Sequence, residues 1–143
     1  MHVFDPNDAQ VAVLTQLGCR RASSEEAVVK AADVVILAVK PDVVPLVLKN
    51  VQSGGGGGVA PSSLIVSVAA GVTIAALEGG LPARSRVVRV MPNTPSLVSE
   101  GATVISAGSS STAADLDVVK QYVRRPLFFI LVNNVSSWMT QGV

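Results

Sequence analysis

Two stretches of the chain are apolar at consecutive positions and not at alternating ones. They read ADVVILAV over residues 32–39 and SLIVSVAA over residues 63–70. A strand with one solvent-exposed face alternates apolar and polar residues, whereas a strand buried on both faces is apolar throughout. The two runs are therefore typical of strands in a parallel sheet that lies between layers of helices.

Helical segments separate the predicted strands at short spacing. Asp8, Ser23 and Thr73 stand where helices are expected to begin, and Gly18 stands where one is expected to end, because these residue types favour such positions. The alternation predicts an α/β fold with a doubly wound, Rossmann-like and mostly parallel sheet. The expected strands lie near residues 3–4, 19–22, 33–39, 64–69, 86–91 and 102–106, and the expected helices near 8–17, 23–31, 42–51, 73–78 and 111–123. The glycines at 54–58 predict a loop within one domain, since the pattern continues on both sides of them.

Charge and reactive residues exclude several classes of protein. The formal net charge is +1 and the basic residues are scattered, so we expect no nucleic-acid partner. Cys19 is the only cysteine and His2 the only histidine, which argues against a disulfide framework, a zinc site and a histidine-based triad. The apolar run at 127–132 is far shorter than the roughly 20 residues that cross a bilayer, so we expect no membrane partner.

The predicted strands end in unusual sequences. Four of these ends read FDPN, VKP, AAG and MPNTP, and each contains glycine, proline or small residues. Any strand end needs a turn, so one such loop alone carries little weight. In open α/β sheets, however, ligands bind beyond the carboxyl ends of the strands. The four loops together therefore predict a ligand crevice at that edge of the sheet.

Three longer segments, in this order and spacing, carry a family resemblance. They are ADVVILAVKPDVV, SLIVSVAAGVTIAALE and RVVRVMPNTPSLVSEGATVISAG, and together they resemble pyrroline-5-carboxylate reductase over roughly residues 1–123. The resemblance implies a Rossmann domain followed by a helical domain that dimerises, and so a homo-oligomeric family. It also implies hydride transfer from NADP(H), with NAD(H) as the alternative, to the C=N carbon of 1-pyrroline-5-carboxylate. The product would be L-proline, in the last step of proline biosynthesis.

The same resemblance implies which residues contact the cofactor. No catalytic residue and no metal ligand is implied, because the cofactor itself performs the hydride chemistry. Lys40 would offer a positive charge to a phosphate or a ribose hydroxyl. The implied contacts are Asp5, Pro6 and Asn7 at the adenosine ribose, Ala38, Val39, Lys40 and Pro41 in the AVKP segment, Ala69, Ala70 and Gly71 near the nicotinamide half, and Met91, Pro92, Asn93 and Thr94 around the nicotinamide pocket.

The sequence also departs from the family pattern. The family begins with a strand and a GxGxxG-type loop that places the pyrophosphate at a helix N-terminus, whereas this sequence starts at what resembles the second strand. We therefore expect a partial NAD(P)-binding Rossmann domain over residues 1–123, without the first βα unit, and a divergent tail over 124–143 in place of the helical domain. Little catalysis is expected from such a chain alone. Glu25, near the adenosine phosphate, would favour NADH over NADPH.

Two other functions remain open from the sequence. One is a non-catalytic Rossmann remnant that binds nucleotide, and the other is an NADP oxidoreductase related to 6-phosphogluconate dehydrogenase. A flavodoxin-like regulatory domain is disfavoured, because no acidic cluster stands at the strand ends. The lone cysteine favours a reducing compartment, so we expect a cytoplasmic protein, with a plastid as the alternative.

Overall fold

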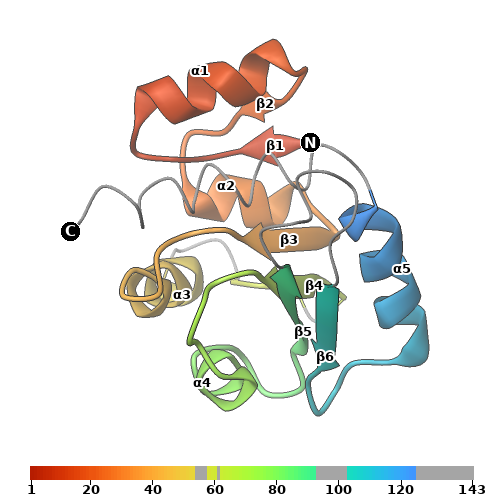
Figure 1. The fold of residues 1–143 in the computed structure, drawn as a ribbon. Coiled ribbons are helices and arrows are strands. Elements are labelled where there is room, and N and C mark those ends of the chain that lie inside the picture. The colour runs from red at the N-terminus through yellow and green to blue at the C-terminus, as the bar shows by residue number, and fades with distance from the viewer. Residues whose placement is uncertain (54–57, 61, 93–102, 125–143) are drawn as a thin grey trace, which may run out of the picture.

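The computed structural model describes residues 1–53, 58–60, 62–92 and 103–124 of the 143-residue chain, and Figure 1 shows its ribbon. Strands and helices alternate along these residues, as the apolar pattern predicts. The strands are β1 (His2–Val3), β2 (Arg20–Arg21), β3 (Val34–Leu37), β4 (Leu64–Ser67), β5 (Arg86–Pro92) and β6 (Thr103–Ala107). The helices are α1 (Asp8–Gln16), α2 (Glu25–Lys30), α3 (Val44–Ser53), α4 (Ile74–Gly79) and α5 (Ala113–Val123). Beyond Arg124 the expected tail lies outside the described residues, as do residues 54–57 of the glycine run.

Four strands form the larger sheet, in the order β3–β4–β5–β6. β3, β4 and β5 are parallel, and β6 pairs with β5 in the antiparallel direction. A helix lies between each successive pair of the three parallel strands in the chain, as a crossover connection requires. The prediction of an α/β fold with a mostly parallel sheet is confirmed.

A second, smaller sheet holds β1 and β2, which pair in parallel. We expected these strands to continue the larger sheet, and here the structure differs, because no ladder joins β1 to β3 within the described residues. The β1–α1–β2 unit has a small apolar core of its own instead. That core consists of Val3, Val11, Leu14 and Cys19.

The larger sheet is packed on both faces. β3, β4 and β5 send alternate side chains into a core shared with α2, α3 and α4, and the intervening ones into a core shared with α5. Figure 1 shows α3 and α4 on one side of the sheet and α5 on the other. All four residues of β4 are buried, which explains why the sequence of this strand is apolar at consecutive positions.

Two of the predicted helix starts are displaced by one residue. Asn7 caps α1, because its side-chain oxygen accepts the Ala9 N–H at 3.0 Å, and Asp8 is the first helical residue. Ser24, not Ser23, caps α2 by accepting the Ala27 N–H at 3.2 Å. In each case the true cap has an extended backbone that aims its side chain at the first turn. The cap predicted for α4, Thr73, is confirmed, and Thr112 caps α5, which was expected to begin near residue 111.

A buried carboxylate fixes the start of α5 against the sheet. Asp115 accepts from the Thr112 N–H and hydroxyl, both at 2.8 Å, and forms an ion pair with Arg86 of β5 at 2.7 Å. The Asp115 side chain is 5% exposed, and the Arg86 guanidinium also donates to the Ser62 carbonyl. One carboxylate therefore joins the helix cap, β5 and the residues before β4.

We predict that Asp115→Asn lowers the free energy of unfolding by about 2 kcal/mol, because a buried charged hydrogen-bonding partner is lost. Asp117→Asn is the matched control in the same helix. Its ion pair with Lys120 is largely exposed, and such pairs contribute at most about 0.5 kcal/mol. Urea denaturation followed by circular dichroism measures both variants. Equal losses for the two aspartates would contradict the role given to Asp115.

Candidate functional site

The parallel register brings the ends of three strands to one edge of the sheet. Leu37 lies opposite Ser67, and Ser67 lies opposite Arg89. The residues that follow these three positions therefore emerge side by side. The sequence predicted a crevice from the composition of these segments, and the strand register places three of the four at a common edge.

The segment after β3 contributes residues 38–41. Ala38 and Val39 are half-buried and pack against the two cores, one on each face of the sheet. Lys40 and Pro41 are exposed. The Lys40 carbonyl accepts the Val43 N–H at 3.0 Å, which turns the chain toward α3. Lys40 is thus a surface cation held at the carboxyl end of β3.

The segment after β4 makes a tight turn around small residues. The buried Ala69 donates its N–H to the hydroxyl of Ser67 at 3.3 Å. Gly71 has a φ of +73°, and a Cβ built on it would meet no atom within 4 Å. The glycine is therefore required by backbone conformation and not by crowding. The space above it leaves the main chain open to a flat ligand.

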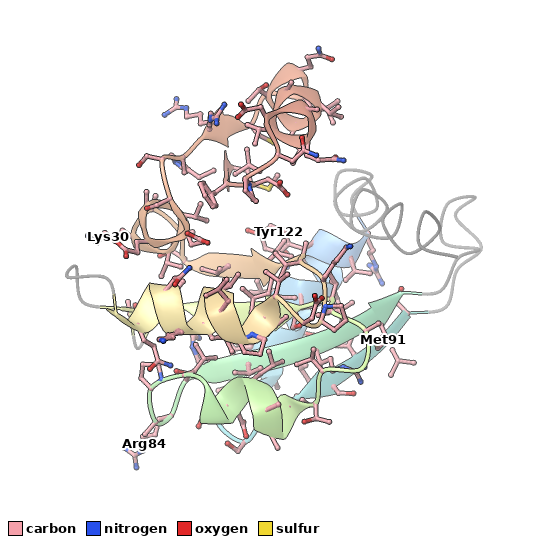
Figure 2. All side chains as sticks on the ribbon, turned by 90° about the vertical axis from the view of Figure 1, so that its left-hand side faces the viewer. Lys30, Arg84, Met91 and Tyr122 are labelled. Atoms are coloured by element: carbon pink, nitrogen blue, oxygen red, sulfur yellow. The ribbon has the colours of Figure 1, made fainter. Side chains whose placement is uncertain are left out.

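At the end of β5, Met91 lies at the edge predicted to hold the crevice. Figure 2 shows Met91 at one end of the sheet and Arg84, in the loop before β5, at the other. Pro92 is the last residue of β5, while Asn93 and Thr94 lie outside the described residues. A cavity bordered by Glu78, Arg84 and Ser109, among others, lies near the Arg84 end, away from the predicted site.

Sequence reasoning gave no role to Arg89, which lies two residues before Met91 on β5. One of its terminal nitrogens donates to the Met91 sulfur at 3.0 Å. Its Nε atom is buried, with no hydrogen-bond partner among the described residues. The available signal was the isolated arginine inside the apolar run VVRVM, which places a cation on one face of a buried strand.

The residues after β1 have structural partners of their own. The Asp5 carboxylate accepts the Asn7 N–H at 2.7 Å, and the Asn7 side chain caps α1. Pro6 is exposed between them. These three residues follow β1 of the smaller sheet, and no strand ladder of the described residues joins that sheet to the strands that carry the other three segments.

Other kinds of site find no support within the described residues. No group of three or more histidine, cysteine, aspartate or glutamate side chains there could hold a metal ion. In the same part of the chain, no helix is both long and apolar enough to cross a membrane. The candidate site thus remains the carboxyl edge of β3, β4 and β5.

A parallel sheet with small, bent segments at its carboxyl edge defines the chain as a Rossmann-type α/β protein, the class that binds nucleotides at such an edge.

A family model described as NADP oxidoreductase, coenzyme F420-dependent, matches residues 3–71. The chain is 39% identical over 122 residues to pyrroline-5-carboxylate reductase 3 of Xenopus laevis. The aligned region covers 85% of this chain and 43% of the relative. It is also 39% identical over 101 residues to a pyrroline-5-carboxylate reductase of Methanosarcina acetivorans, over 71% of this chain and 36% of the relative.

Solved structures agree with these relatives. The fold matches a pyrroline-5-carboxylate reductase from Coxiella burnetii with a TM-score of 0.67 and 32% identity, over 82% of this chain and 43% of that one. A Plasmodium falciparum pyrroline carboxylate reductase with NADP bound matches with a TM-score of 0.63 and 29% identity, over 79% and 39% of the two chains. The chain belongs to the pyrroline-5-carboxylate reductase family, and it spans less than half the length of these relatives.

We predict that Gly71→Ala and Gly18→Ala each lower the free energy of unfolding by about 1 kcal/mol, because both glycines have positive φ and open space around the Cβ position. Only Gly71 lies at the carboxyl edge of the larger sheet. The affinity for NADPH should therefore fall about fivefold, or about 1 kcal/mol, in Gly71→Ala alone. Thermal denaturation and NADPH fluorescence titration measure the two quantities. Equal losses of affinity in the two variants would contradict this placement of the site.

Proposed function

We propose that this chain supplies the cofactor-binding part of a pyrroline-5-carboxylate reductase. The proposed reaction is the NAD(P)H-dependent reduction of 1-pyrroline-5-carboxylate to L-proline. The observation that carries the proposal is the common edge of three parallel strands. Residues 38–41 follow β3, residues 69–71 come after β4, and β5 ends there with Met91 and Pro92. The names of the similar proteins, one of them solved with NADP, support it.

The residues at this edge fit a flat nicotinamide ring and a negatively charged phosphate. The exposed Gly71 leaves its main chain accessible, beside the half-buried and small Ala70, and Lys40 supplies positive charge. Bound NAD(P)H would supply the hydride, and no side chain of this edge needs to act as an acid, a base or a nucleophile. The task of these residues is to hold the ring in one orientation and to keep water from one of its faces. Asn93 and Thr94 are proposed to complete this pocket.

The cofactor is proposed to be NADP(H), as in the Plasmodium falciparum relative. Two carboxylates of this chain bear on that choice. Asp5 follows β1, and Glu25 is the first residue of α2. A carboxylate beside the adenosine ribose accepts a hydrogen bond from a 2′-hydroxyl and repels a 2′-phosphate. We therefore also propose that the chain binds NADH with measurable affinity.

The free, buried Cys19 suits a reducing compartment such as the cytoplasm.

Lys40→Gln is expected to weaken NADPH binding about tenfold, since a charge-assisted hydrogen bond contributes about 1.5 kcal/mol or more. Lys49→Gln, an exposed lysine on α3, is the control for the change in net charge. Isothermal titration of both variants gives the two affinities, and thermal denaturation shows whether the folds are equally stable. Similar NADPH affinities of the two variants would show that Lys40 is not part of the site.

The function itself is tested on the 143-residue chain with NADPH and 1-pyrroline-5-carboxylate. Saturable NADPH binding is expected from fluorescence, without competition by flavin mononucleotide. Any NADPH consumed should reappear as an equal amount of L-proline, at a rate far below that of a full-length relative. Absence of NADPH binding at millimolar concentration would overturn the proposal. Reduction of NADP by 6-phosphogluconate would favour the alternative oxidoreductase, and NADPH binding without any proline formed would favour a nucleotide-binding remnant.

A further inference from the structure

Strand β5 carries two arginines that differ in how their charge is balanced. Arg86 forms an ion pair with the buried Asp115 at 2.7 Å. Arg89, three residues later, is half-buried, and no carboxylate of the described residues forms an ion pair with it. A guanidinium is always charged in proteins. Within the described part of the chain, Arg89 therefore brings an unbalanced positive charge into the sheet.

The hydrogen bonds of Arg89 do little to offset this charge. Its Nε atom is buried and has no partner among the described residues. One terminal nitrogen donates to the Met91 sulfur at 3.0 Å, and a thioether is a neutral and weak acceptor. A buried polar atom without a partner is costly. Arg89 therefore lowers the stability of the sheet, and a role in function would explain why a charged residue stands at this position.

Alternation along β5 places Arg89 on one face of the sheet. Val87 packs in the core on the side of α3 and α4, and Val88 packs in the core on the α5 side. Side chains two and four residues after Val87 lie on the same face as Val87, and these are Arg89 and Met91. Ala69, which follows β4, packs in the same core as Val87. The cation thus lies on the face of the sheet that Ala69 and Met91 share.

Arg89 is also the last position of the β4–β5 ladder before the carboxyl edge. It lies opposite Ser67 of β4 and Ser106 of β6. Both of these cross-strand neighbours are neutral, so neither balances the positive charge. Ser67 leads within two residues into segment 69–71, which is proposed to lie near the nicotinamide. The unbalanced cation therefore stands directly behind the proposed cofactor site.

We propose that Arg89 makes this edge bind the reduced cofactor in preference to the oxidised one. The nicotinamide ring is neutral in NADPH and carries one positive charge in NADP⁺. A cation held in a sheet that partly excludes water repels the charged ring more strongly than it would in bulk water, and it does not repel the neutral ring. This preference suits a reductase, which takes up the reduced form and releases the oxidised form. The inference rests on the proposed function and adds to it a residue that determines specificity.

Isothermal titration of the 143-residue chain with NADPH and with NADP⁺ gives the ratio of the two dissociation constants. The wild-type chain should bind NADPH at least about tenfold more tightly than NADP⁺. Arg89→Met and Arg89→Gln both remove the charge, and each should reduce this preference about tenfold, chiefly by tightening NADP⁺ binding. Arg89→Lys keeps the charge and should keep most of the preference.

Arg84→Met is the matched control for the loss of one arginine charge. Arg84 is exposed in the loop before β5, at the end of the sheet away from Met91 (Figure 2). This variant should bind the two forms of the cofactor with the wild-type ratio. A merely structural role of Arg89 would weaken both forms by the same factor and leave the ratio unchanged. Thermal denaturation of each variant shows whether its fold is intact.

Two results would overturn this inference and leave the proposed function in place. The wild-type chain could bind NADP⁺ as tightly as NADPH, and this measurement needs no variant. The uncharged variants could keep the wild-type ratio, whether or not both affinities fall. Absence of binding of either form to the wild-type chain would overturn the inference together with the proposed cofactor site.

Discussion

The parallel ladder of β3, β4 and β5 is the constraint on which the rest of the structure depends. It aligns Leu37, Ser67 and Arg89 in register, and this alignment alone brings segments from distant parts of the sequence to one edge. Burial on both faces keeps the ladder in place, because a shift by one residue would exchange the side chains of the two cores. Apolar packing therefore determines the geometry of the proposed cofactor site. The residues of the site itself can be small and can form turns.

Much of this arrangement could be predicted from the sequence. The apolar runs at β3 and β4 reveal two-sided burial directly, and Thr73 marks the start of α4 correctly. The displaced caps at Asn7 and Ser24 show the limit of such reasoning. Neighbouring polar residues compete for a cap, and the backbone conformation that decides between them is set by packing. The family resemblance rested on ordered motifs, and the relatives with 39% identity confirm it.

What the sequence could not reveal was pairing between strands. The strands predicted near residues 3–4 and 19–22 were expected in the same sheet as β3, yet the structure pairs the corresponding β1 and β2 only with each other among the described residues. Strand order depends on long-range hydrogen bonds that leave no local signature in composition. Arg89 was missed for a related reason, since its buried Nε and its contact with Met91 arise from the sheet. The positions of Asn93 and Thr94 lie outside the described residues and stay predictions.

The central claim is that the carboxyl edge of β3, β4 and β5 holds a nicotinamide cofactor. NMR mapping of NADPH onto the ¹⁵N-labelled chain tests it most directly. The account predicts that the largest shift changes fall on the amides of residues 38–40 and 69–71 and of Met91. Changes centred on Arg84 and Ser109, near the opposite end of the sheet, would contradict it, as would the absence of any saturable change.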